Sequence, residues 1–324
     1  MSRDTPYSVR GGGADHGVRP LTSHVSRVTP PADSTEGAAV LRARRVLESA
    51  GVPDARREAD ELYAALTGAA ASAAWLARAQ PAPPTLDARL GAAARRRAAG
   101  WPQAYAAGRA NFRGHWLTVD RRVLIPRPET EGLTELVLEW MRGDTAVGAA
   151  ERVVADVGTG SGAIAVALAL ESPARRLVAT DRSAGALEVA RANCAEHGVG
   201  SRVELVRGHL LAPLAAGRFD VVVSNPPYVA TGDWERLEPS VRDFEPREAL
   251  DGGSDGLAAI RELVIAARAA LRPGGLLALE VDAPRAGRVA DLVAAAGFAS
   301  HAVLEDLCGR PRYVRARRPA DGSD

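Results

Sequence analysis

Two short segments of this 324-residue chain combine residue types that can bind a ligand or hold a reacting group. The first is Gly158–Gly162, which follows the apolar run Val153–Val157 and precedes a helical pattern at Ile164–Leu170. Glycines let the backbone approach a ligand closely, and a helix N-terminus offers free N–H groups. The segment therefore predicts a ligand-binding loop between a strand and a helix. A tight turn without a ligand is the alternative.

Two acidic residues bear on which ligand this loop would take. Gly158, Gly160 and Ala163 satisfy the G-x-G-x-x-A form of a dinucleotide fingerprint. Asp156 and a third glycine, Gly162, nevertheless favour a ligand other than NAD. Asp156 lies at the strand end, where it can meet an ammonium group. Asp181 ends the next predicted strand, where its carboxylate can accept hydrogen bonds from two ribose hydroxyls. A cap on the following helix is the alternative for that residue.

The second segment is Asn225–Tyr228, Asn-Pro-Pro-Tyr, directly after another apolar strand pattern. Pro226 and Pro227 remove two N–H donors and stiffen the turn, which fixes the Asn225 side chain and the Pro226 carbonyl. Those two oxygens can accept both hydrogens of a planar –NH2 group, with Tyr228 against its flat face. Holding both hydrogens aims the nitrogen's remaining orbital at an electrophile, so the segment predicts catalysis by positioning, without a strong base. A plain turn is the alternative.

An alternation of strand and helix patterns from Arg152 onward would position both segments. Strands are predicted at Val153–Val157, Leu177–Asp181, Val203–Val206, Asp220–Ser224 and Leu276–Val281. Helices are predicted between them, including Ile164–Leu170, Ala184–His197 and Ala258–Leu271. The alternation favours a parallel sheet covered by helices on both faces, whose carboxyl edge would carry both segments.

The chain before this sheet divides into three predicted parts. Residues 1–34 lack periodicity and are expected to be a disordered tail, and 35–100 a small helical domain. Asp33 and Glu36 have capping-box spacing, and Glu58, like Arg95–Arg97, is expected on an exposed helix face. Residues 101–128 are predicted to be a hairpin linker with strands Phe112–Trp116 and Leu117–Val119. The sheet domain would cover 129–318 and a short tail 319–324.

Composition excludes several classes of function. All 41 basic residues are arginine, which excludes a lysine nucleophile and the lysine-bearing P-loop. The two cysteines exclude a disulfide framework, and the six scattered histidines lack metal-ligand spacing, so no metal is expected. A formal charge of +1 gives no reason to expect direct nucleic-acid binding. Neither a secretory signal nor an apolar stretch of membrane-spanning length is seen, so we expect a cytoplasmic protein.

The glycine loop, Asn225–Tyr228 and Leu124–Glu131 (Leu-Ile-Pro-Arg-Pro-Glu-Thr-Glu) together resemble the bacterial protein-(glutamine-N5) methyltransferases that act on peptide chain release factors. The likeness covers most of residues 37–317, including Glu245–Leu257 and Leu271–Gly275. Asn-Pro-Pro-Tyr alone is shared with amino-methylating DNA and RNA enzymes, whereas Leu124–Glu131 and the helical domain are far more particular.

The resemblance implies a Rossmann-like, S-adenosylmethionine-dependent α/β sheet of seven strands, preceded by a helical domain that binds the substrate. Its last strand, around Val314, would be antiparallel. The implied reaction moves a methyl group from S-adenosylmethionine to the glutamine amide nitrogen of the Gly-Gly-Gln motif. The expected partner is a release factor, and the enzyme is expected to be a monomer.

Carried over position by position, the resemblance implies roles for individual residues. Cofactor contacts are implied for Asp156, Gly158, Thr159, Gly160, Ser161, Gly162, Asp181, His209, Leu210 and Asn225. Substrate contacts are implied for Arg127, Glu129, Asn225, Pro226, Pro227 and Tyr228, of which Asn225, Pro226 and Tyr228 would be catalytic. Glu131 would shape the site with Arg127 and Glu129. A plain helix start, where the dipole favours acids, is the alternative for that segment.

Three departures from the family pattern keep other functions open. His209 stands where the family commonly has an acid, Glu280–Arg285 differs from the usual Glu-Ile-Gly segment, and Pro102–Gly108 is also off pattern. They fit a paralogue with another protein substrate, or a non-catalytic paralogue that binds the translation machinery. An amino-methyltransferase acting on a nucleobase is a further alternative, which predicts an additional basic surface. A nicotinamide dehydrogenase would leave Asn225–Tyr228 without a purpose.

Overall fold

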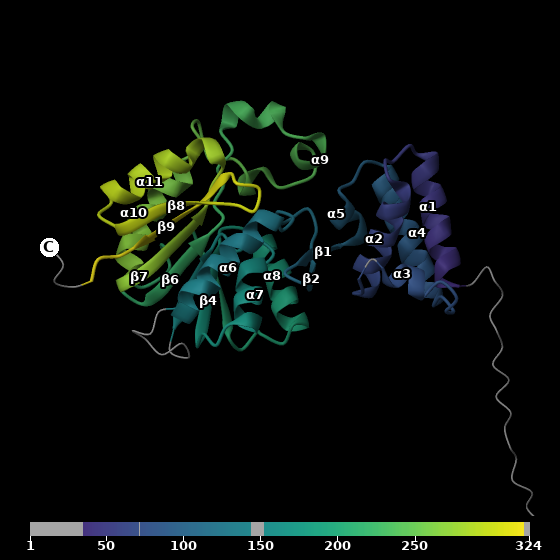
Figure 1. Cartoon of the computed structure of the whole chain (residues 1–324), viewed down its shortest axis with the longest axis horizontal. Helices are drawn as coiled ribbons and strands as arrows, with labels where there is room; N and C mark the ends of the chain where they lie inside the picture. Colours follow the sequence, from purple (N-terminus) through teal and green to yellow (C-terminus); the bar gives the residue numbers. More distant parts are fainter. Residues whose placement is uncertain (1–34, 71, 144–151, 321–324) are drawn as a thin grey trace, which may run out of the picture.

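The computed structural model describes residues 35–70, 72–143 and 152–320, and shows a helical bundle beside an α/β sheet (Figure 1). The predicted tail 1–34, which includes Asp33, lies outside these residues, as do residues 321–324 of the predicted tail 319–324. The bundle contains helices α1 (Glu36–Ser49), α2 (Ala55–Thr67), α3 (Ala73–Leu76), α4 (Pro84–Ala98) and α5 (Gln103–Ala107). None of the helices in the described ranges is both long and apolar enough to cross a membrane.

Small residues let the bundle helices pack closely. The buried side chains of α1, α2 and α4 are mostly alanine and leucine, including Ala39, Ala43, Leu47, Ala59, Leu62 and Leu90. Helix α1 is capped by Thr35, whose Oγ1 accepts a hydrogen bond from the Ala38 N–H at 3.2 Å. The prediction that Glu58 is exposed was wrong. It is buried on α2 because Arg97 of α4 donates two hydrogen bonds to its carboxylate, at 2.9 and 3.0 Å.

A two-stranded hairpin lies between the bundle and the sheet (Figure 1). Its strands are β1 (Arg109–Phe112) and β2 (His115–Thr118), so the predicted strand boundaries were wrong. Arg113 and Gly114 form the turn, and both have positive φ, 52° and 80°. Positive φ at both central residues suits a tight two-residue hairpin, and the predicted strand pattern ran across it.

The second part of the chain is a seven-stranded sheet of the order β5-β4-β3-β6-β7-β9-β8. Its strands are β3 (Val153–Val157), β4 (Arg176–Asp181), β5 (Val203–Arg207), β6 (Phe219–Ser224), β7 (Leu271–Glu280), β8 (Ala299–Glu305) and β9 (Pro311–Arg317). Strand β9 is antiparallel to both neighbours, and Val314 lies opposite Leu279 of β7. The predicted α/β sheet with an antiparallel last strand, preceded by helices, is confirmed.

Helices cover both faces of the sheet. One face packs against α6 (Pro128–Gly143), α7 (Ala163–Glu171) and α8 (Ala184–Glu196), and the other against α10 (Ala258–Ala270) and α11 (Ala286–Ala295). The stretch between β6 and α10 carries short helices: η3 (Thr231–Arg236), α9 (Pro239–Arg242) and η4 (Arg247–Ala249). Another short helix, η5 (Ala283–Arg285), follows β7. Because the strand order reverses between β3 and β6, their carboxyl ends open a crevice, which is where α/β sheets bind ligands.

Candidate active site

The glycine loop between β3 and α7 forms one wall of this crevice. Gly158, Gly160 and Gly162 all have positive φ, at 71°, 56° and 81°. The N–H groups of Gly158 and Thr159 both donate to the Thr180 carbonyl at 2.9 Å, which ties the loop to β4. A Cβ added at Gly158 or Gly160 would meet no atom within 4 Å. The loop therefore presents open backbone to the crevice.

Asp156 lies beneath this loop and is fully buried. Its Oδ2 accepts hydrogen bonds from Thr159 Oγ1 at 2.6 Å and from the Ala165 N–H at 3.1 Å. Its Oδ1 has no partner among the described residues, and burial raises the pKa of this carboxyl to about 7. Thr159 and Ser161 are also buried. These three side chains shape the loop from below rather than lining the cavity above it.

Asp181 faces the crevice from the end of β4. Its Oδ1 accepts a hydrogen bond from the Ser183 N–H and its Oδ2 one from the Gly160 N–H, both at 2.9 Å. Each carboxylate oxygen has a second lone pair, so Asp181 can still accept two further hydrogen bonds. Burial raises the pKa of this carboxyl, and the N–H groups of Ser183 and Gly160 oppose the rise. The cap of α8 is Ser183, whose Oγ accepts from the Ala186 N–H at 3.2 Å, so Asp181 is not the helix cap.

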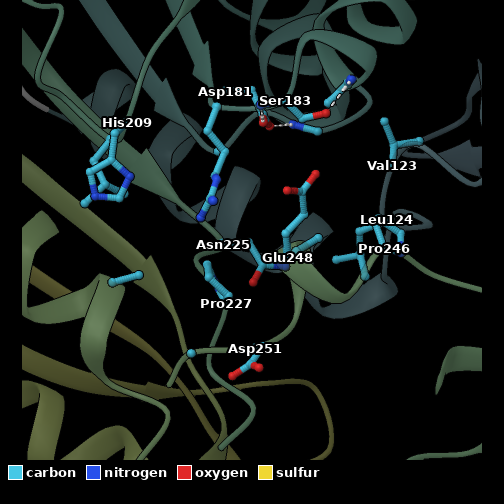
Figure 2. A pocket seen from close by; sticks show the side chains of 18 of the residues that line it. Val123, Leu124, Asp181, Ser183, His209, Asn225, Pro227, Pro246, Glu248 and Asp251 are labelled. Atoms are coloured by element: carbon cyan, nitrogen blue, oxygen red, sulfur yellow. Dashed lines mark hydrogen bonds between the residues drawn. The ribbon is translucent and has the colours of Figure 1, made fainter. Parts of the chain in front are cut away.

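A cavity of about 450 Å³ lies above the loop, a size typical of small-molecule sites. Figure 2 shows Asp181, His209 and Asn225 around it, with Glu248 of η4 also on its wall. The remaining lining includes Arg122, Val123, Leu124, Gly158, Gly160, Leu210 and Pro227. His209 lies at one end, where its Nε2 is 2.8 Å from Oε2 of Glu262 on α10. A carboxylate therefore stands beside the histidine that replaces an acid in the family pattern.

The Asn225–Tyr228 turn forms the opposite wall. Asn225 donates from Nδ2 to Thr130 Oγ1 at 3.0 Å. Within the described residues, neither Asn225 Oδ1 nor the Pro226 carbonyl accepts a hydrogen bond. Asn225 Oδ1 and the carbonyl of the adjacent Pro226 are therefore two neighbouring acceptors that can take the two hydrogens of one –NH2 group.

Close backbone packing holds this turn in place. A Cβ added at Gly252 would lie 2.6 Å from the Pro227 carbonyl oxygen and 2.8 Å from that of Gly256. Val229 donates to the Leu250 carbonyl at 2.9 Å, and Gly252 donates to the Val229 carbonyl at 2.8 Å. Only glycine fits this approach at position 252.

Beyond Asp156, Thr159, Ser161 and Gly162 in and beneath the glycine loop, four more predicted site residues do not line the cavity. Arg127 forms a salt bridge with Glu245, which is buried at 1% side-chain exposure and also accepts from the Ile125 N–H at 3.1 Å. The Glu129 carbonyl accepts from Tyr313 Oη at 2.7 Å. Pro226 is buried, and Tyr228 is half-buried with its pKa raised by burial. Arg127 and Glu129 thus join the start of α6 to neighbouring segments.

Sequence reasoning missed Thr130 and Glu280 as members of this site. Thr130 Oγ1 donates to Glu280 Oε2 at 2.7 Å, and both residues are buried. Thr130 lies inside the distinctive Leu124–Glu131 segment, which was a usable signal. Glu280 was considered only as the start of a divergent segment. Among the described residues, no group of three or more His, Cys, Asp or Glu side chains could hold a metal ion.

A Rossmann-like sheet with a glycine loop after β3 and Asn-Pro-Pro-Tyr after β6 defines a methyltransferase domain, and comparisons with known proteins agree. A family model described as "Methyltransferase small domain" matches residues 132–237, and one described as "PrmC N-terminal domain" matches residues 38–108. The hMettl16 catalytic domain shares the fold, with a TM-score of 0.52 and 15% identity, covering 72% of this chain and 83% of that one.

Curated relatives give the particular family. The release factor glutamine methyltransferase of Cereibacter sphaeroides is 43% identical over 274 residues, which are 85% of this chain and 95% of the relative. The protein of the same name from Geobacter sulfurreducens is 40% identical, over 85% of this chain and 93% of the relative. The chain belongs to the release factor glutamine methyltransferase family.

Proposed function

We propose that this protein methylates the side-chain amide nitrogen of the glutamine in the Gly-Gly-Gln motif of peptide chain release factors, using S-adenosylmethionine. The family assignment supports the substrate, since relatives aligned over nearly their whole length carry that name. We further propose that the protein works in the cytoplasm as a monomer, and that the bundle of α1–α5 binds the release factor. Neither a membrane nor a nucleic acid enters the proposed reaction.

The observation that carries the proposal is a pair of acceptors, Asn225 Oδ1 and the Pro226 carbonyl, that accept no hydrogen bond from the part of the chain that the structure describes. An unmodified glutamine amide has two N–H hydrogens, and this pair can hold both. Holding both hydrogens points the nitrogen lone pair away from the protein turn. It also resists delocalisation of that lone pair into the carbonyl of the glutamine's own amide group. Such fixed positioning lowers the barrier without a strong base. One of the two hydrogens leaves as a proton to solvent at the open cavity once the methyl group is attached.

The cavity residues also fit S-adenosylmethionine, which when bound supplies a methyl group on a positively charged sulfonium. Gly158 and Gly160 leave open space where a side chain would otherwise stand, so a ligand can lie against the loop backbone. Asp181 keeps two lone pairs for ribose hydroxyls, and His209 and Leu210 would flank the adenine. Asp156, whose Oδ1 has no partner among the described residues, contributes negative charge beneath the loop when it is ionised, and that charge favours a cationic ligand above it.

The test is incubation of the purified protein with S-adenosylmethionine and unmodified release factor, followed by peptide mass spectrometry. One methyl group on the Gly-Gly-Gln glutamine is expected. A release factor with that glutamine changed to alanine is the control and should stay unmodified. Methylation of RNA or DNA oligonucleotides instead, or binding of S-adenosylmethionine without methylation of the release factor, would refute the proposed substrate.

A further inference from the structure

We propose that Thr130 and Glu280 are positioning residues that fix which way round the Asn225 amide lies, so that its oxygen and not its nitrogen faces the substrate. This inference rests on the function proposed above, because the Asn225 oxygen matters only if a substrate –NH2 group is held there.

The three side chains come from three separate elements. Asn225 directly follows β6, Glu280 ends β7, and Thr130 lies in the first turn of α6. Ser224 is paired with Leu279 in the parallel register, so Asn225 and Glu280 follow at neighbouring strand ends. Asn225 Nδ2 donates to Thr130 Oγ1 at 3.0 Å, and Thr130 Oγ1 donates to Glu280 Oε2 at 2.7 Å. At 5% and 1% exposure, Thr130 and Glu280 have little access to water as a replacement partner.

The chemistry of the hydroxyl makes this chain of hydrogen bonds directional. A threonine hydroxyl has one hydrogen to donate, and an ionised carboxylate can only accept. The Thr130 hydrogen must therefore go to Glu280, which leaves only lone pairs toward Asn225. An asparagine amide has nearly the same shape either way round, so a hydrogen-bond partner decides its orientation. Here Asn225 must present its –NH2 to Thr130, which turns Oδ1 away from Thr130.

The start of α6 is held so that Thr130 keeps this place. Tyr313 of β9 donates from Oη to the Glu129 carbonyl at 2.7 Å, and Gly132 approaches the Tyr313 ring so closely that no Cβ fits there. Helix α6, β7 and β9 therefore form one packed unit around the hydrogen-bond chain. The position of Thr130 relative to Glu280 is set by this packing and not by a flexible loop.

Protonation of Glu280 would remove the fixed donor-to-acceptor direction of this chain of hydrogen bonds. Burial raises the pKa of this carboxyl to about 7, against the lowering effect of the Thr130 hydrogen bond and Arg312. A protonated Glu280 can donate to Thr130, whose hydroxyl can then donate to the Asn225 oxygen and reverse the amide. The other titratable and charged groups that interact with Glu280 are Glu129 in the first turn of α6, Arg127 just before α6, Tyr228 after β6 and Tyr313 of β9.

The first test compares Thr130→Val, which removes the hydroxyl at nearly constant shape, with Thr130→Ser, which keeps it. Loss of a buried orienting hydrogen bond predicts a kcat about 10- to 100-fold lower for Thr130→Val, whereas Thr130→Ser stays within about threefold of wild type. The dissociation constant of S-adenosylmethionine should not change. Equal activity of the two Thr130 variants would overturn the proposal.

Two further measurements distinguish a positioning role of Thr130 and Glu280 from a loss of folding and from an error in the proposed substrate. Wild-type kcat should fall below about pH 7, and Glu280→Gln, which cannot ionise, should be less active without that fall. An unchanged acid fall in Glu280→Gln would contradict the proposal. In the free wild-type protein, the Asn225 side-chain amide protons should exchange slowly by NMR, and faster in Thr130→Val. This last result needs no substrate, so it decides the hydrogen-bond chain even if the release factor proves not to be the substrate.

Discussion

The salt bridge between Arg127 and Glu245 gives a sharp stability prediction. The Glu245 side chain is 1% exposed and Arg127 is 30% exposed, so the arginine is the charged partner of an otherwise enclosed carboxylate. Replacing Arg127 by methionine keeps an unbranched apolar stem but leaves that carboxylate without its cation. Removing one partner of a buried pair typically costs 3–5 kcal/mol, and because water reaches Arg127, we expect about 3 kcal/mol at pH 7.5.

Arg122→Met is the matched control. Arg122 pairs with Glu188 and Asp120, but its side chain is 46% exposed and theirs are 63% and 43% exposed. Exposed pairs contribute about 1 kcal/mol or less, so this variant should lose far less stability. The assay is equilibrium urea unfolding followed by far-ultraviolet circular dichroism, in the absence of ligands.

The pH dependence supplies a second check with a definite sign. Burial already raises the pKa of Glu245 above the ordinary value of 4.5, and the Arg127 charge opposes that rise. Without Arg127 the folded-state pKa rises further, so the variant loses stability as pH increases from the unfolded-state pKa through the folded one. The difference from wild type should therefore be largest at neutral pH and shrink toward pH 4.5. A cost no greater than that of Arg122→Met, or a cost independent of pH, would refute this reasoning.

Two other predictions concern the glycine contact and the buried acid. Gly252→Ala places a Cβ 2.6 Å from the Pro227 carbonyl oxygen, so the turn must shift and kcat/KM should fall about 100-fold. The control is Gly232→Ala, whose added Cβ meets no atom within 4 Å. Equal activity of the two variants would contradict the role of this contact. Asp156 has a folded pKa of about 7 against an ordinary 3.8, so its contribution to wild-type stability should fall as pH rises between these values, by on the order of 4 kcal/mol. Other buried carboxyls such as Glu280 also have raised pKa values, so Asp156→Asn should reduce this slope in urea unfolding rather than abolish it. An unchanged slope would show that Asp156 does not titrate in this range.

The sequence predicts the sheet well because its central strands are apolar runs buried on both faces. The prediction Val153–Val157 coincides with β3, and Asp220–Ser224 falls one residue short of β6. Strand β7 begins at Leu271, five residues before the predicted start, because Arg-Pro-Gly-Gly has the composition of a turn. A register irregularity opposite Phe219–Val221 accommodates that segment within the strand.

The candidate site was predictable where its residues follow parallel strands of the sheet, and unpredictable where only side-chain packing brings residues together. Gly158, Asp181 and Asn225 follow parallel strands, so their common edge follows from topology alone. The chain from Thr130 through Glu280 to Asn225 joins positions that only the packing of α6 against β7 brings together. Residue types at those positions gave no sign of this contact.

The most direct test of the account is the effect of Asn225→Ala on methyl transfer and on cofactor binding, measured on the same preparation. Methylation of the release factor is followed by peptide mass spectrometry, and S-adenosylmethionine binding by calorimetry. The account predicts that methylation is abolished while the dissociation constant stays nearly unchanged, because Asn225 holds the glutamine amide. Methylation that persists near the wild-type rate, or cofactor binding lost together with activity, would contradict the role assigned to Asn225.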